Sequence, residues 1–355
     1  MRKVGTGVKE RIEWIDWIKG VALVLVIIGH TFRTSMYDES MAYSYIKSFI
    51  YAFHMPLFIA ISGFLFKMGL KKYIATNTLD FVKTRVGSYM KPLISYAVII
   101  YTCFSAVSLV PGVRKMIGGG YNVFEYFLLT MAGENPYSVH LWYLLTLFLI
   151  TLTCYIFSKI SYRLHYNEIV VLFILAFLLW NIRIIFGETF CMTAKSYLKY
   201  TIFFVFGMIL YKNRKGFPVK LYIPLSILSW FYIAIYSADM ITTTVFAFKY
   251  LKNIFVLISC LTVIMNFFDI ARKSHVFCGR KMKYLGKNSM VFYLFHQPFC
   301  AMFGLVLYEK IGLPGYIVCI ACFAGSLILP QLVILISRKS QTVRSALTAL
   351  FDIKV

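Results

Sequence analysis

Ten apolar runs, each long enough or nearly long enough to cross a lipid bilayer, dominate this sequence of 355 residues. A helix needs roughly 20 predominantly apolar residues to cross the hydrocarbon core. Hydrophobic residues make up 60% of the chain and charged residues only 14%, which excludes an ordinary soluble domain. We therefore predict an all-α, polytopic membrane bundle of about ten transmembrane helices. The expected spans are Ile15–Phe32, Ser48–Phe66, Lys91–Val110, Leu141–Ser158, Ile169–Phe186, Leu198–Tyr211, Leu221–Tyr236, Ile254–Phe268, Ser289–Tyr308 and Gly315–Ile336.

Basic residues are distributed unevenly between alternate connecting segments. If the N-terminus is placed in the cytoplasm, the inner segments contain 27 of the 37 Lys and Arg residues. Cytoplasmic loops of membrane proteins are enriched in Lys and Arg, so this asymmetry predicts that both termini are cytoplasmic. The net charge of +23 is then explained by topology and anionic lipid, and no nucleic-acid partner is expected. Residues 1–355 are expected to form a single membrane domain without a separate soluble domain.

The first span carries three ionisable residues on nearly one face. Eleven steps of about 100° separate Lys19 from His30 and bring the helix back to within roughly 20° of the same direction, and Asp16 lies close to that face. An ionisable residue inside a membrane is costly, so His30 is a functional candidate by default. The alternatives are a packing role for His30 and a salt bridge between Asp16 and Lys19 that anchors the helix.

Three of the six histidines are expected at one depth in the membrane. His30 falls about 22 Å along a helix that starts inside, which places it in the outer half of the bilayer. His54 comes early in the second span, which runs inward, and His140 lies at the outer rim of the fourth. Whether they meet laterally stays open at the level of the sequence. The histidines lie on separate helices without Cys partners at ligand spacing, so no metal site is expected.

The ninth span contains further candidates. Asn288 and Ser289 are expected to cap its first turn on the cytoplasmic side. His296 lies near the middle of the membrane, and Pro298 should kink the helix directly after it. The sequence leaves a functional role and a structural role for His296 equally open.

The segment IDWIKGVALVLVIIGH resembles the opening of the acyltransferase-3 family of integral-membrane acyltransferases, in particular the branch of fucose 4-O-acetylase-like proteins. The family has a basic residue, ten intervening positions and then His, which here are Lys19 and His30. FHMPLFIAISGFLF, the helix start HLWYL and YLGKNSMVFYLFHQPF are similar to further segments of the family. The resemblance implies transfer of an acyl group, most simply acetyl, from cytoplasmic acetyl-CoA or another acyl-CoA, with no bound cofactor.

The resemblance also implies roles for residues. His30 would be the base that removes the proton of the acceptor hydroxyl, a task that suits an imidazole with a pKa near neutrality. His54 and Ser62 are candidates to relay that proton or to select the tautomer of His30, and Lys19 would meet the donor. The remaining candidates are Lys83, Arg85 and Lys91 for the CoA phosphates, and Glu134 and His140 for the acceptor side. The family has a second Arg where this chain has Ser88, and Glu134 has the alternative of a solvated loop carboxylate.

Together these observations favour an O-acyltransferase of the bacterial plasma membrane. Its acceptor would be a saccharide, namely a cell-surface or secreted polysaccharide or its precursor, and envelope-polysaccharide biosynthesis proteins are possible partners beside the lipid bilayer. Two alternatives stay open. A glycan or lipid transporter or flippase would use the same buried polar residues as a pathway, and a sensor or scaffold in an envelope-polymer assembly would not need the histidines.

Overall fold

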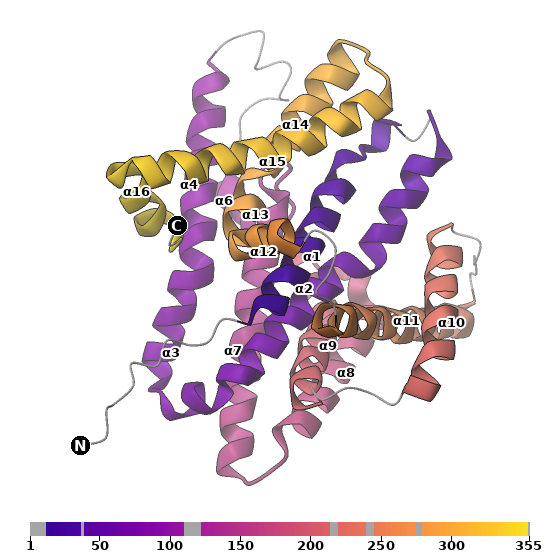
Figure 1. Ribbon diagram of the computed structural model, residues 1–355. Helices are drawn as coiled ribbons and strands as arrows, with labels where there is room; N and C mark the ends of the chain where they lie inside the picture. The colour runs from indigo at the N-terminus through magenta and orange to yellow at the C-terminus, as the bar shows by residue number, and fades with distance from the viewer. Residues whose placement is uncertain are drawn as a thin grey trace.

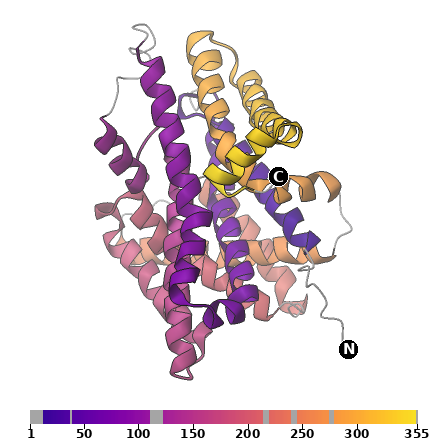
Figure 2. The ribbon, with the colours of Figure 1, turned by 90° about the vertical axis from the view of Figure 1, so that its left-hand side faces the viewer.

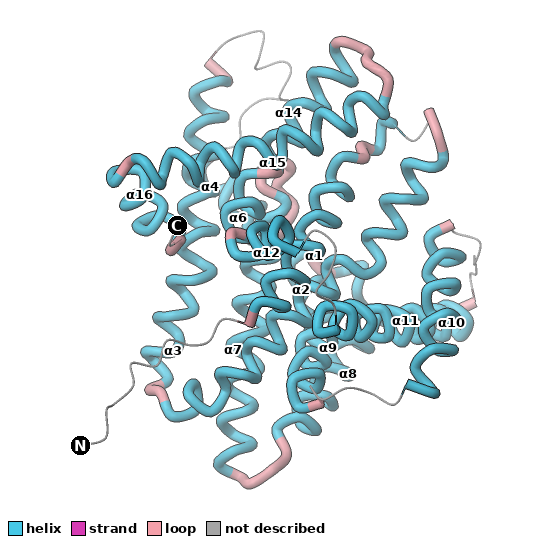
Figure 3. The backbone as a smooth tube through the Cα atoms, in the orientation of Figure 1, coloured by secondary structure: helices cyan, strands magenta, loops and turns pink. Residues whose placement is uncertain are grey.

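The structure is a computed structural model that describes residues 12–36, 39–109, 122–213, 219–238, 245–273 and 279–353, and Figure 1 shows them as a bundle of helices. The described residues contain α-helices with short 3-10 and π segments and no strand (Figure 3), which confirms the all-α prediction. The helices are α1 (Glu13–Thr31), α2 (Met41–Ala75), α3 (Thr78–Arg85), α4 (Lys91–Val107), α6 (Val123–Ala132), α7 (Trp142–Arg163), α8 (Glu168–Phe186), α9 (Met192–Lys212), α10 (Val219–Ser237), α11 (Phe246–Lys273), α12 (Gly279–Lys287), α13 (Ser289–Phe295), α14 (Gln297–Phe303), α15 (Gly315–Lys339) and α16 (Gln341–Phe351).

Six helical segments of the described chain are long and apolar enough to cross a membrane. They are Glu13–Thr31, Met41–Ala75, Val139–Arg163, Glu168–Thr189, Ala247–Arg272 and Gly315–Lys339. These segments coincide with the first, second, fourth, fifth, eighth and tenth predicted spans. The chain is therefore a polytopic helical membrane protein.

The other four predicted spans are helical but shorter, more polar or interrupted. The α4 helix has 17 residues, and α9 carries Lys195 and Lys199 near its start. The ninth predicted span is divided at His296, where α13 ends and α14 begins. Pro298 in the first turn of α14 has no N–H to donate, which accounts for the interruption and agrees with the predicted kink. The total of ten spans stays a prediction.

The predicted side-chain cap of the ninth span is wrong. Asn288 occupies the N-cap position of α13, but its side chain makes no capping bond. The side-chain amide instead donates to the carbonyl of Tyr284 at 2.9 Å. The chain enters α13 directly from α12, so the amide of Asn288 is turned back toward the preceding helix and Ser289 becomes the first residue of the new one.

Two close helix crossings hold α1 and α2 in the middle of the bundle. A Cβ atom at Gly207 of α9 would overlap the main-chain carbonyl of Ala60 in α2. A Cβ atom at Gly286 of α12 would overlap the carbonyl of Asp16 in α1. Small residues let helix backbones approach closely, which matters in a bilayer because lipid is as apolar as the helix surface. The glycines therefore decide which helices become neighbours.

The C-terminal helices pack against α1 and α4, α15 on the first and α16 on the second. The α16 helix packs on α4, and its Leu347 and Phe351 are buried in one apolar cluster with Leu93 and Tyr96. Figure 2 shows these yellow C-terminal helices beside the purple α4. The α13 helix, which ends just before His296, also packs against α1.

Candidate active site

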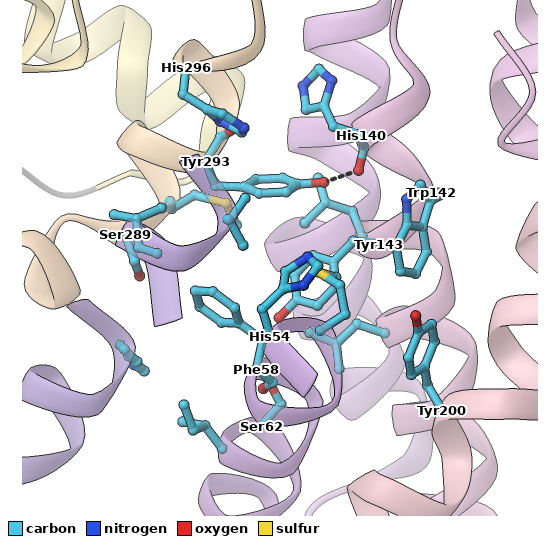
Figure 4. A pocket seen from close by; sticks show the side chains of 18 of the residues that line it. His54, Phe58, Ser62, His140, Trp142, Tyr143, Tyr200, Ser289, Tyr293 and His296 are labelled. Carbon is cyan, nitrogen blue, oxygen red and sulfur yellow. Dashed lines mark hydrogen bonds between the residues drawn. The ribbon is translucent and has the colours of Figure 1, made fainter. Parts of the chain in front are cut away.

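A cavity of 330 Å³ lies between α1, α2, α7, α9 and α13. Its volume is at the lower end of the range for small-molecule sites in proteins. Aromatic and aliphatic side chains form most of its wall, and a few polar groups converge on it (Figure 4). The predicted site residues on this wall are Lys19, His30, His54, Ser62, His140, Ser289 and His296.

The structure brings four histidines from separate helices to this cavity. The ring centroids of His30 and His296 are 5.3 Å apart, and those of His140 and His296 are 6.0 Å apart. The ring of Tyr51 contacts both His54 and His30. Its centroid lies 4.7 Å from that of His54 and 6.2 Å from that of His30. The lateral convergence that the sequence left open is therefore present, and the nearest imidazole to His30 is His296 rather than His54.

Hydrogen bonds select the tautomer of two of these rings. The Nδ1 atom of His54 lies 2.8 Å from the carbonyl of Ile50, and Nδ1 of His296 lies 2.8 Å from the carbonyl of Tyr293 and 3.0 Å from that of Phe292. A carbonyl oxygen can only accept, so Nδ1 carries the hydrogen in both rings. In the neutral imidazole the Nε2 atom then presents a lone pair.

Three buried imidazole nitrogens have no hydrogen-bond partner in the described part of the chain. They are Nε2 of His296 and both nitrogens of His140. An unpaired buried polar atom costs about 1–3 kcal/mol, so such groups in native proteins usually meet a ligand, a water or a catalytic partner. Figure 4 places His140 and His296 at one end of the cavity and Ser62 at the other.

Tyrosines complete the site, and the sequence interpretation missed them. The Tyr293 hydroxyl donates to the main-chain carbonyl of His140 (dashed in Figure 4), and Tyr51 and Tyr143 also line the cavity. A signal was available, because the pattern Tyr-x-Phe-His-x-Pro occurs at residues 51–56 and again at 293–298. A Tyr three residues before a His lies on the same helix face, so each copy delivers both rings to one side.

Three of the residues predicted to support catalysis or to bind the acyl acceptor do not line the cavity. Asp16 is buried beside α12. The side-chain amide of Asn288 donates to the carbonyl of Tyr284 in α12. Glu134 is exposed in the loop after α6, and its carboxylate accepts from the main-chain N–H of Met192 at 3.3 Å. Met192 is the first residue of α9, so Glu134 supplies a partner and a negative charge to that helix N-terminus.

A second cavity of 160 Å³ adjoins the first, because Ser62, Leu65 and Tyr89 line both. Arg85 lies on its wall, with its guanidinium carbon 4.6 Å from the ring centroid of Tyr73. Lys83 and Lys91 are exposed and line neither cavity. Of the three cations predicted to bind CoA phosphates, only Arg85 therefore faces a space that leads to the histidines.

Within the described ranges, no group of three or more His, Cys, Asp or Glu side chains is arranged to hold a metal ion. The polar side chains on the cavity wall carry imidazoles, hydroxyls, the ammonium of Lys19 and the indole N–H of Trp142. Such groups can accept a proton from an alcohol and donate to a developing negative charge, which are the requirements of acid–base and acyl-transfer chemistry.

The sequence was compared with known proteins. A family model described as "Acyltransferase domain" matches residues 12–333. The nodulation protein NolL of Mesorhizobium japonicum is 36% identical over 104 residues, which cover 28% of this chain and 27% of the relative. The nodulation protein NolL of Sinorhizobium fredii is 42% identical over 62 residues, 17% of each chain. The matches thus span less than a third of these relatives, and no solved structure matches.

Proposed function

This chain belongs to the acyltransferase-3 family, and from that premise we propose that it is a membrane-embedded O-acyltransferase. It would move an acyl group, most simply acetyl, from acyl-CoA to a hydroxyl of a cell-surface or secreted polysaccharide or its precursor. The observation that carries the proposal is the cavity in which His30 meets three further imidazoles. The resemblance to the fucose 4-O-acetylase-like branch supports a saccharide as the acceptor.

The proposed reaction is a direct transfer with His30 as the base. His30 takes the proton of the acceptor hydroxyl while the hydroxyl oxygen attacks the carbonyl carbon of the thioester. The carbon–sulfur bond then breaks, and the proton passes from His30 to the departing CoA thiolate. Supporting or acceptor-binding roles are proposed for the other polar groups on the wall, which are Lys19, His54, Ser62, His140, Ser289 and His296. Asp16, Glu134 and Asn288 lie off the cavity wall and are not included.

The donor is proposed to enter from the cytoplasm, where acyl-CoA is made. Arg85 would bind a CoA phosphate, because a guanidinium matches phosphate geometry and its cavity adjoins that of His30. This fits a single bacterial plasma-membrane domain of about ten spans with both termini cytoplasmic, as the distribution of Lys and Arg suggests. Envelope-polysaccharide biosynthesis proteins are the partners that such a reaction would need.

Replacing Arg85 with Ala is expected to raise KM for acetyl-CoA by about 10-fold or more, because a charge-assisted hydrogen bond contributes about 1.5–3 kcal/mol. KM for the acceptor should stay unchanged. Steady-state kinetics with each substrate varied in turn measure both constants. Lys83→Ala is the matched control, since Lys83 is exposed and two residues away. Equal donor KM values for the wild type and Arg85→Ala would assign Arg85 to membrane topology alone.

Radiolabelled acetyl-CoA incubated with membranes from expressing cells tests the proposed function. Label is expected to move into an alkali-labile ester on saccharide material, and only when the chain is present. A transporter or flippase would move a glycan without consuming acetyl-CoA, and a scaffold would do neither. Absence of enzyme-dependent label in any saccharide fraction would therefore contradict the proposal.

A further inference from the structure

A catalytic imidazole needs a partner for its second nitrogen. In serine hydrolases a buried carboxylate holds the N–H opposite the basic nitrogen and keeps the ring in the productive tautomer. The wall of the central cavity, as far as the structure describes it, contains no Asp or Glu. His30 also makes no hydrogen bond to the main chain of the described residues, whereas His54 and His296 do. Another group must orient His30.

His296 has the properties of that group. Its side chain is completely buried at 0% exposure, and its Nδ1–H donates to the carbonyls of Phe292 and Tyr293. Its Nε2 lone pair has no partner in the described chain. Two imidazoles joined by an N–H···N bond of about 3 Å have ring centroids about 5 Å apart. The rings of His30 and His296 are 5.3 Å apart, with planes inclined by 54°.

We propose that His296 is the positioning residue for His30. No hydrogen bond joins the two rings in the structure, so the proposal includes a rotation of the His30 ring that lets Nε2 of His296 accept the His30 N–H. The opposite nitrogen of His30 then presents its lone pair to the acceptor hydroxyl. This rests on the proposed function, in which His30 is the base. When His30 takes the hydroxyl proton, the donor of this bond becomes charged and the bond strengthens. The proton then leaves for the CoA thiolate, and both rings return to their neutral state.

A neutral hydrogen-bond acceptor for the His30 N–H suits a position inside the membrane. A carboxylate would serve the same purpose, but an ionised group inside the bilayer is expensive. An imidazole locked by main-chain carbonyls presents one directed lone pair without a net charge. His54 belongs to the same Tyr-x-Phe-His-x-Pro pattern and has the same Nδ1 bond, yet its ring lies against Tyr51. His54 is therefore a matched comparison for His296.

Kinetics of His296 variants test the proposal. His296→Phe is expected to lower kcat by about 100-fold or more, with KM for both substrates unchanged, because the base loses its orientation. His296→Gln should recover kcat to within about 10-fold of the wild type, because the side-chain amide oxygen can accept the N–H of His30. If His296→Phe keeps kcat within 3-fold, or raises acceptor KM alone, His296 is not the positioning residue.

A second measurement does not need activity. The ¹⁵N spectrum of purified protein labelled in histidine should show His30 in a single tautomer, assigned by its loss in His30→Gln. In His296→Phe the His30 signals should move to a mixture of tautomers, whereas in His54→Phe they should stay. Mixed tautomers in the wild type would overturn the proposal even if His296→Phe fails to fold. A wild-type protein that lacks transferase activity but shows this His296-dependent tautomer would refute the proposed function and support the pairing.

Discussion

Replacing His30 with Ala is expected to abolish acyl transfer, with a fall in kcat of about 10²–10⁴-fold or to below detection. That range is the contribution of a positioned general base. His30 faces the central cavity and is the imidazole that the resemblance to the family marks as the base. The measurement is transfer of label from acetyl-CoA to saccharide by membranes that contain equal amounts of each variant.

The control must separate loss of the base from loss of the fold. His165 lies outside the cavity, exposed between α7 and α8, with a φ of 58° in the left-handed region. Asn tolerates that conformation, so His165→Asn should keep full activity and normal expression. His30→Ala should also elute as a monodisperse protein in detergent. Normal saccharide acetylation by His30→Ala would remove the assignment of the base.

The second large effect is expected on folding. Gly207→Ala should destabilise the protein by about 1–3 kcal/mol or more, because the added methyl group meets the main chain of α2 and forces α2 and α9 apart. The sign of the stability change distinguishes the packing clash from the effect of helix propensity. Ala is favoured over Gly inside a helix by about 1 kcal/mol, so helix propensity alone predicts a stabilised protein.

Thermal stability followed by size-exclusion chromatography in detergent measures this effect. Gly87→Ala is the matched control, because a Cβ atom at Gly87 meets nothing within 4 Å. Its melting temperature should equal or exceed that of the wild type, while that of Gly207→Ala should fall or the protein should aggregate. A Gly207→Ala protein as stable as Gly87→Ala would show that α2 and α9 do not cross as closely as the structure places them.

The sequence interpretation was most successful where the signal is carried by a single helix. Apolar runs identified six segments that the structure also presents as long apolar helices. The helical period placed Lys19 and His30 on one face of α1, and both line the cavity. These inferences need only the rise and twist of a helix and the cost of exposing polar groups to lipid.

The sequence interpretation was least successful in predicting which residues of different helices lie next to each other. Glu134 was grouped with His140 as a candidate for the acceptor side, yet its carboxylate accepts a hydrogen bond from the first residue of α9. His54 was chosen as the partner of His30 by depth, and His296 proved closer. Depth along the membrane normal is one coordinate, and lateral position depends on contacts between helices that no single run of residues contains.

The class of the protein and the position of each polar residue along its own helix were thus determined by the sequence alone, because the hydrophobic effect and the helical period act locally. Which polar faces meet was decided by the tertiary structure. Close approaches at Gly207 and Gly286 set the neighbours of α1 and α2. The ring of His296, at the interruption between α13 and α14, lies 5.3 Å from that of His30. The cavity lined by four imidazoles forms only when all of these helix contacts are present in the same fold.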